Sequence, residues 1–271
     1  MQKSKDRPFS DTIEKAYRCF ISKLLQIEKK LNKYVVASSL DSSISWICCE
    51  QIANQSHEAR WNIIPPENMH RPLFTIVAVT YQNIPALCVF LQAFNCQTCR
   101  DFCMHILHDG IHPETERTID RMKPHLNYHL ELTVTKERYN DWGHSLRSLA
   151  LPHIDTEFIV FTNADNYYIP RFVEYVAAAI SRYGLDLVYW DMIHSHPFPG
   201  GRTLHDYSLF KTRPSIRNID IGAFAVRSSI AKRVGFTHAS YDADGLFLQD
   251  LLATTEIRRI GYIDKVLLVH N

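Results

Sequence analysis

The sequence lacks the features that mark a membrane-spanning, exported or nucleic-acid-coating protein. No apolar run approaches the about 20 residues of a membrane span, and the opening MQKSKDRPFSD has no apolar signal-peptide core. The 30 basic and 29 acidic side chains nearly cancel, which leaves room only for a local basic patch. We therefore expect a cytoplasmic protein, soluble or peripheral at the inner face of a membrane, with no nucleic-acid partner.

Phosphate-binding loops are also missing. The chain contains neither G-x-G-x-x-G nor G-x-x-x-x-G-K-[ST]. Any phosphate charge in a bound ligand would therefore have to be met by a metal ion. A nucleotidyltransferase is disfavoured for the same reason, because VAVTYQNIPA holds no Gly-rich loop bearing Lys or Arg.

The cysteines form no obvious disulfide framework. There are seven, an odd number, and no export signal, so reduced thiols are expected. Cys96, Cys99 and Cys103 form a C-x2-C-x3-C run whose spacing suits zinc or an iron-sulfur cluster. No fourth ligand is evident, and the run falls between a helical pattern and a strand. Buried or half-buried thiols are the favoured interpretation.

Residues 1–70 differ in character from the rest. An a/d seam of apolar residues there predicts a helix, with Lys and Glu on its other faces. The seam consists of Ile13, Tyr17, Phe20, Leu24, Ile27, Leu31 and Tyr34. It can be covered by a second helix at about 43–59, by the main domain or by another subunit as a homo-oligomer. A membrane-surface role is weaker, because the polar face mixes both charge signs. Pro65 and Pro66 indicate a linker.

From residue 71 onward, strand patterns alternate with helix patterns. LFTIVAVTY is an unbroken apolar run typical of a strand covered on both faces. The alternation predicts an α/β, Rossmann-like domain over 71–271, with a mostly parallel sheet and helices on both faces. Strands are expected at 73–81, 104–107, 130–135, 158–162 and 185–190, and helices at 84–93, 144–151, 171–183 and from Pro113.

Polar residues follow the predicted strands at the points where they end. In FIVFTNADNYYIP, an apolar strand runs directly into Asn163 and Asp165, which offer two oxygen ligands. The carboxyl ends of parallel strands meet at one edge, where open α/β sheets bind ligands. We therefore expect one crevice to be lined by Thr80, Tyr81, Asp109, Asn163, Asp165 and Asp191.

With these motifs in order, residues 71–271 resemble the family 2 glycosyltransferases of the GT-A fold. RPLFTIVAVTYQNIPALCVFLQAFNCQT resembles the opening strand and helix, and ILHDG the second strand, with His108 in place of one acid and Asp109 kept. DWGHSLRSLAL is similar to the segment over the donor, where Gly143 and Arg147 keep the pattern. TNADNYYIP is similar to the DxD region, and IDIGAFAVRSSIAKRVGF to the acceptor-side strand.

The resemblance implies a metal site. Asp165, as the last carboxylate of the DxD, would hold Mn²⁺ or Mg²⁺ against the donor diphosphate, and His270, ending KVLLVHN, would be a further ligand. Asn163 replaces the first Asp and would meet a ribose hydroxyl or the metal without supplying charge, so metal affinity would be weaker. The alternatives are a turn or capping role for Asp165 and a surface position for His270.

The resemblance also implies a catalytic base in YDADGLFLQDLL. Asp244 best matches the acid that takes the acceptor proton, with Asp242 as the runner-up and Asp250 as structural. The positive end of the following helix is expected to lower the pKa of Asp244. Asp109 with Thr80 and Tyr81 would hold the base and ribose of the donor.

The long segment HSHPFPGGRTLHDYSLFKTRP, from His194 to Pro214, follows a strand end. A segment of this length in a compact domain is usually functional, and we expect it to border the acceptor or to move as a lid. His194 and His196 offer metal ligands as an alternative, but a second metal site lacks a clear third partner.

Together these features predict a metal-dependent, inverting glycosyltransferase that moves a sugar from a nucleotide-diphosphate sugar, with UDP favoured, to a carbohydrate or glycolipid hydroxyl. Polysaccharide or glycoconjugate synthesis would be its setting. A catalytically silent binding or scaffold module is the alternative, suggested by Asn163, His108 and the heptad-bearing N-terminus.

Overall fold

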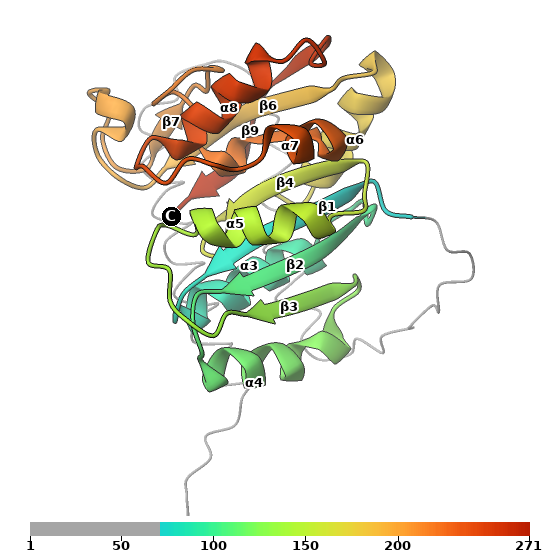
Figure 1. Cartoon of the computed structure of the whole chain (residues 1–271), viewed down its shortest axis with the longest axis vertical. Coiled ribbons are helices and arrows are strands. Elements are labelled where there is room, and N and C mark those ends of the chain that lie inside the picture. The colour runs from blue at the N-terminus through green and yellow to red at the C-terminus, as the bar shows by residue number, and fades with distance from the viewer. Residues whose placement is uncertain (1–70) are drawn as a thin grey trace, which may run out of the picture. The chain divides into compact units, whose positions relative to one another are not determined.

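A nine-stranded mixed sheet organises residues 71–271, which are the residues that the computed structural model describes (Figure 1). The helical segment predicted for residues 1–70, with its seam and oligomerisation surface, lies outside them. The strands are β1 (Phe74–Thr80), β2 (Phe102–His108), β3 (Leu130–Val134), β4 (Phe158–Asn163), β5 (Tyr167–Tyr168), β6 (Leu187–His194), β7 (Ser208–Phe210), β8 (Phe224–Arg227) and β9 (Ile260–His270). The α-helices are α3 (Ile84–Asn95), α4 (Pro113–Met122), α5 (His144–Ala150), α6 (Phe172–Tyr183), α7 (Ser228–Val234) and α8 (Ala243–Ala253).

The strand directions create one functional edge. The order is β3-β2-β1-β4-β8-β6-β9-β5, with β7 paired to β6. β1, β2, β3 and β4 are parallel, and β8 is antiparallel to both β4 and β6, so β6 and β9 again run in the direction of β4. The strand ends Thr80, His108, Asn163, His194 and His270 therefore share one side of the sheet, which we call the carboxyl edge. The expected Rossmann-like, mostly parallel sheet is confirmed.

Helices cover both faces of the sheet. On one face, α3 packs beside α6, with the rings of Phe94 and Phe172 6.2 Å apart. On the other, α5 and α8 meet through Phe236, whose ring lies 5.4 Å from His144 and 4.9 Å from Phe247 (Figure 1). β1 lies in the middle, where the Ile76, Val77 and Ala78 side chains are fully buried, as its unbroken apolar run predicts.

Asp191 corrects one expectation. β6 does not end at Trp190 but continues to His194, so Asp191 lies inside the strand and not at its end. Its buried carboxylate accepts hydrogen bonds from Thr212 N at 2.9 Å and Tyr262 Oη at 2.7 Å and pairs with Lys211 Nζ at 2.8 Å. The prediction that Asp191 faces the crevice is wrong, because these partners offset its burial and fasten β7 and β9 to β6.

The segment from His194 to Pro214 is partly folded. It contains a short 3-10 turn at Pro199–Gly201 and strand β7, which pairs antiparallel with β6 through Met192 and Phe210.

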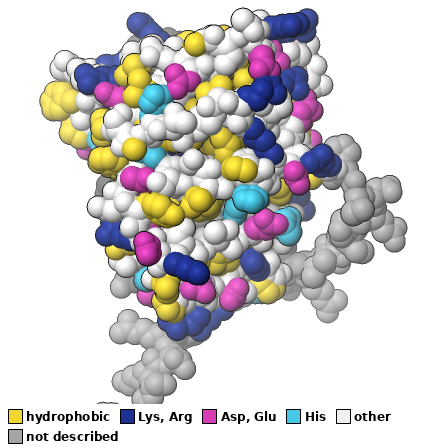
Figure 2. Space-filling model, in the orientation of Figure 1, with side chains coloured by type: hydrophobic (Ala, Val, Ile, Leu, Met, Phe, Trp, Pro, Cys, Tyr) yellow, Lys and Arg dark blue, Asp and Glu magenta, His cyan; other side chains and the backbone are white. Residues whose placement is uncertain are grey.

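No helix between residues 71 and 271 is long and apolar enough to cross a membrane. Figure 2 shows basic and acidic side chains interspersed on the face that it draws.

Candidate functional site

Asp165 lies in the turn that follows β4 at the carboxyl edge. Its Oδ1 atom is buried and has no hydrogen-bond partner. Burial raises the pKa of the carboxyl and Asp220 raises it further, whereas His270 and His196 act in the opposite direction. A buried acceptor without a partner is uncommon in native proteins and indicates a missing ligand such as a cation.

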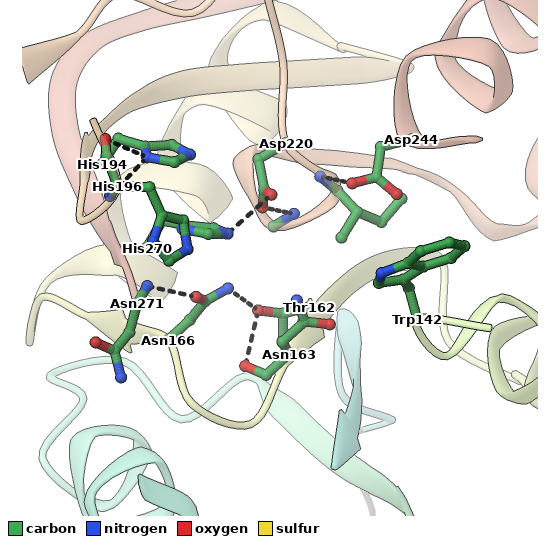
Figure 3. A network of polar contacts seen from close by, with 12 residues as sticks. Trp142, Thr162, Asn163, Asn166, His194, His196, Asp220, Asp244, His270 and Asn271 are labelled. Carbon is green, nitrogen blue, oxygen red and sulfur yellow. Dashed lines mark hydrogen bonds and ion pairs between the residues drawn. The ribbon is translucent and has the colours of Figure 1, made fainter. Parts of the chain in front are cut away.

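A polar network fixes this turn against the end of β9 (Figure 3). Thr162 Oγ1 accepts hydrogen bonds from Asn166 Nδ2 at 3.1 Å and from Tyr168 Oη at 2.9 Å. Asn166 Oδ1 in turn accepts from the backbone N–H of Asn271 at 3.2 Å. The network brings the residues around Asp165 and His270 together although they are far apart in the sequence.

His270 ends β9 and faces a second carboxylate. Its Nε2 lies 3.5 Å from Asp220 Oδ2, while its Nδ1 is buried without a partner. The ring stacks on His194 with centroids 4.5 Å apart, and His196 lies 5.5 Å away. Burial and His270 lower the pKa of His194 to about 4, so this neighbour is neutral at pH 7.

Asp220 is the site residue that sequence reasoning missed. It lies in the turn before β8, where its Oδ1 accepts a hydrogen bond from Gly222 N at 2.8 Å. Its charge acts on Asp165, Asp244 and Arg147. The sequence signal for Asp220 is the Asp-x-Gly turn inside IDIGAF, a segment that resembles the acceptor-side strand as a whole.

Asp244 lies in the first turn of α8, as predicted, but its pKa is shifted in the opposite direction. Burial, followed by repulsion from Asp220, raises the pKa of the carboxyl to about 6, although Arg147 and a 3.2 Å hydrogen bond from Ile221 N oppose the rise. A helix dipole contributes only about 0.3–1 kcal/mol, so burial outweighs it. The expected lowering is wrong.

The two neighbouring acids of this segment have other partners. The Asp242 carboxylate accepts hydrogen bonds from Arg217 Nε and Nη2, each at 3.2 Å. Asp250 lies 2.6 Å from His238 Nε2, which agrees with a structural role. Of the three acids, Asp244 is therefore the one whose pKa responds to the charge of Asp220.

Arg147 and Asn163 form the floor of the site. The buried Arg147 donates from Nη2 to Asn163 Oδ1 at 2.6 Å and from Nη1 to the Trp142 carbonyl at 2.9 Å. Burial lowers the pKa of Arg147 and the nearby Asp244 and Asp220 raise it, and an arginine remains charged in proteins. The Asn163 oxygen is thus engaged by a cation from its own chain.

The donor residues expected at β1 and β2 lie side by side. Asp109 accepts the backbone N–H groups of Tyr139 at 2.7 Å and Asn140 at 2.9 Å, and its own N–H donates to the Thr80 carbonyl at 3.1 Å. The guanidinium carbon of Arg138 lies 3.7 Å above the centre of the Tyr81 ring. The Asp109 carboxylate therefore fixes a loop that places a cation over an exposed aromatic ring.

His108 links two turns at the carboxyl edge. Its Nδ1 lies 2.7 Å from the Gly110 carbonyl, and Nε2 accepts the N–H of Gln82 at 3.2 Å, which assigns the proton to Nδ1. Burial lowers the pKa of the imidazole below its usual value, which favours the neutral ring. His108 ties the turn after β1 to the turn after β2.

The residues fit a divalent cation with two protein ligands. Within residues 71–271, no group of three or more His, Cys, Asp or Glu side chains is arranged to hold a metal ion. Cys103, from the C-x2-C-x3-C run, has its thiol 3.4 Å from Thr75 Oγ1. Asp165 and His270 each present a buried atom without a partner, next to Asp220. A carboxylate and a neutral imidazole suit Mn²⁺, whose remaining positions water and phosphate oxygens can fill.

Gly143 precedes α5 where no side chain fits. Its φ is +82°, and an added Cβ would lie 2.6 Å from Val79 Cγ2. We expect Gly143→Ala to lower the free energy of unfolding by about 2–4 kcal/mol through backbone strain and overpacking. Gly201→Ala is the control, with φ +77° and nothing within 4 Å of the added Cβ. Thermal unfolding midpoints that fall equally for both variants would show that the Val79 contact is unimportant.

Known proteins match this chain in structure and not in sequence. No family model and no curated protein sequence matches it. Among solved structures, S. aureus TarS 1–349 is 20% identical with a TM-score of 0.59, covering 73% of this chain and 60% of that one. The same protein in complex with UDP-GlcNAc is 18% identical with a TM-score of 0.58, covering 72% of this chain and 57% of that one.

A second solved structure has the same fold. The mannosyltransferase PcManGT from Pyrobaculum calidifontis, in complex with GDP-Man and Mn²⁺, is 16% identical with a TM-score of 0.57, covering 82% of this chain and 63% of that one. The chain spans about 60% of the length of TarS 1–349. At such low identity the likeness concerns the fold, and the expected similarity to GT-A glycosyltransferases is confirmed at that level.

Proposed function

We propose that this protein is a metal-dependent, inverting glycosyltransferase that moves a sugar from a nucleotide-diphosphate sugar to a hydroxyl acceptor. The observation that carries the proposal is the pair of buried, unpartnered ligand atoms, Asp165 Oδ1 and His270 Nδ1, at the carboxyl edge. Asp244, with a pKa raised to about 6, lies in the same charge cluster. A carboxylate with a pKa near neutrality is suited to proton transfer at physiological pH.

The donor would lie along the ends of β1, β2 and β4. Tyr81 offers an exposed ring for a base, and the loop anchored by Asp109 carries Arg138 over one face of that ring. Gly143 and Arg147 support the floor next to Asn163. Solved structures of the same fold hold UDP-GlcNAc and GDP-Man, which supports a nucleotide sugar as the donor, and we favour a UDP-sugar.

Negative charge dominates the proposed metal site. The carboxylate of Asp220 acts on those of both Asp165 and Asp244, and Arg147 supplies opposing charge. A Mn²⁺ or Mg²⁺ ion held by Asp165 and His270 would supply charge that neutralises a departing diphosphate. Asp220, 3.5 Å from His270 Nε2, would orient the imidazole as carboxylates do for metal-binding histidines.

Transfer requires one proton to leave the acceptor. Asp244 would accept the proton of the acceptor hydroxyl as that oxygen forms a bond to the anomeric carbon. The bond between this carbon and the diphosphate oxygen breaks, and its electron pair leaves with the nucleotide diphosphate. A single displacement of this kind inverts the anomeric configuration. The acceptor, a carbohydrate or glycolipid in polysaccharide or glycoconjugate synthesis, would approach from the side of α8 and the segment that follows β6.

One observation favours a catalytically silent binding module as the second candidate. The Asn163 carboxamide, which replaces an acid, already accepts a hydrogen bond from Arg147. A site with one carboxylate fewer binds a divalent cation more weakly. The two candidates differ in whether nucleotide binding depends on metal and leads to turnover.

Calorimetry with UDP and with GDP, each with and without Mn²⁺, tests the proposal. We expect one nucleotide to bind at least about tenfold more tightly with Mn²⁺, a difference of about 1.4 kcal/mol, because metal and diphosphate complete each other's coordination. A matched assay of donor hydrolysis across UDP- and GDP-sugars then reports turnover. Metal-dependent binding without hydrolysis or transfer favours the binding module, and no binding of either nucleotide rejects the donor site.

A further inference from the structure

Two exposed aromatic side chains meet beside Asp244. Trp142, just before α5, is 65% exposed, and Tyr241, just before α8, is 82% exposed. Their rings lie 6.4 Å apart at an interplanar angle of 81°, although they come from distant parts of the sequence. In Figure 3 the indole of Trp142 points toward Asp244. We call Trp142 and Tyr241 the aromatic corner.

The backbone holds the aromatic corner in place at an energetic cost. Trp142 has a φ of +57°, a conformation that is rare for a bulky residue and costs about 1–3 kcal/mol. Its carbonyl accepts a hydrogen bond from the buried Arg147, and Gly143 follows with φ +82°. A strained backbone that directs a large apolar ring into solvent contributes nothing to the core, which indicates a ligand contact.

The surroundings of the corner are polar. Asp242, next to Tyr241 in the chain, is paired with Arg217, and Asp141, next to Trp142, accepts hydrogen bonds from Ser145. A lipid chain would require a closed apolar surface, which these charged neighbours do not provide. A sugar ring has an apolar C–H face to cover an aromatic ring and hydroxyl groups to meet the ion pair, so the mixture suits a carbohydrate.

We propose that the aromatic corner binds a pyranose ring of the acceptor and presents its hydroxyl to Asp244. The inference rests on the proposed function and narrows the acceptor to a carbohydrate. Tyr241 lies on the acceptor side, because it precedes the helix whose first turn carries Asp244, and Trp142 reaches it from the segment that leads to Gly143 and Arg147 of the proposed donor site. The donor residues Tyr81 and Asp109 lie instead at the ends of β1 and β2.

An array test compares the wild type with Trp142→Ala, Tyr241→Ala and Tyr183→Ala. The array carries pyranosyl oligosaccharides, polyol phosphates, lipids and Ser/Thr peptides, and each full-length protein is applied with UDP and Mn²⁺. Tyr183 is the control, because its ring is 57% exposed but it ends α6 at the opposite edge of the sheet. We expect the wild type and Tyr183→Ala to bind pyranosyl ligands equally, and each corner variant to bind them about tenfold more weakly, the effect of losing roughly 1.4 kcal/mol of stacking.

Three results of the array would overturn the inference: binding confined to ligands that are not sugars, equal binding by the corner variants and the wild type, or no glycan bound by the wild type. Nucleotide titrations of all four proteins separate this failure from failure of the proposed function. If every variant still binds the nucleotide, the donor site stands and only the proposed acceptor contact is wrong. A corner variant that loses nucleotide affinity instead would place Trp142 or Tyr241 in the donor site and would equally reject the inference.

Discussion

Asp244→Asn is expected to lower the transfer rate by about 10²–10⁴-fold, the usual contribution of a general base. The carboxamide keeps the shape of the side chain but cannot take the acceptor proton. Affinity for the nucleotide should change little, because Asp244, in α8, accepts a hydrogen bond from Ile221 N, whereas the residues proposed to hold the base and ribose follow β1 and β2. Steady-state transfer and nucleotide titration measure the two effects.

The dependence of the rate on pH provides the second measurement on this residue. A base must be ionised to act, so kcat/KM of the wild type should rise with pH through the pKa of Asp244, about 6. Asp242→Asn is the matched control, since Asp242 is paired with Arg217. This variant should keep the rise of kcat/KM with pH, which we call the acidic limb. Loss of nucleotide binding in Asp244→Asn, or loss of the acidic limb in Asp242→Asn, would contradict the role of Asp244 as the general base.

Asp165→Asn is expected to abolish the effect of Mn²⁺ on nucleotide affinity and to lower transfer by more than about 100-fold. Even outer-shell partners of metal ligands are worth roughly 10–100-fold, and Asp165 is proposed as a direct ligand. His270→Ala should act in the same direction. Calorimetry with and without Mn²⁺ measures the metal effect without reference to turnover.

Stability separates a lost ligand from a damaged fold. Burial and Asp220 both disfavour the ionised form of Asp165, whose Oδ1 has no partner. Without metal, Asp165→Asn should therefore unfold at the same temperature as the wild type or at a higher one. Asp264→Asn, which removes an exposed carboxylate from the same strand as His270, is the control and should keep the Mn²⁺ effect. A Mn²⁺ effect unchanged in Asp165→Asn would remove this residue from the metal site.

Much of the fold was readable from local patterns. The apolar run that became β1 and the strand and helix periods after it predict the elements within a few residues, because burial on one or both faces imposes a spacing on the chain. The pattern fails at Asp191, a charged residue that local spacing places just past the end of a strand. Partners from β9 and from the segment that follows β7, remote in the sequence, allow that carboxylate to lie inside β6.

The site was readable only in part. Asp165 is expected at the site because it follows a strand whose end meets other strand ends at one edge of the sheet, whereas Asp244 and His270 are expected there from the resemblance to family 2 glycosyltransferases. Asp220 was missed, and the pKa of Asp244 was expected to move the wrong way. Both errors have the same cause: the contact between Asp220 and His270 and the burial of Asp244 depend on groups brought together by folding.

By itself, the sequence determined the order of strands and helices and the chemistry available at their ends, since periodicity and residue type are local properties. Only the tertiary structure decided which of these groups act on one another. It left Asp165 Oδ1 and His270 Nδ1 without partners, engaged Asn163 with Arg147, and set Trp142 against Tyr241. Desolvation and Coulomb interactions depend on distance through space, which the spacing of residues along a chain does not specify.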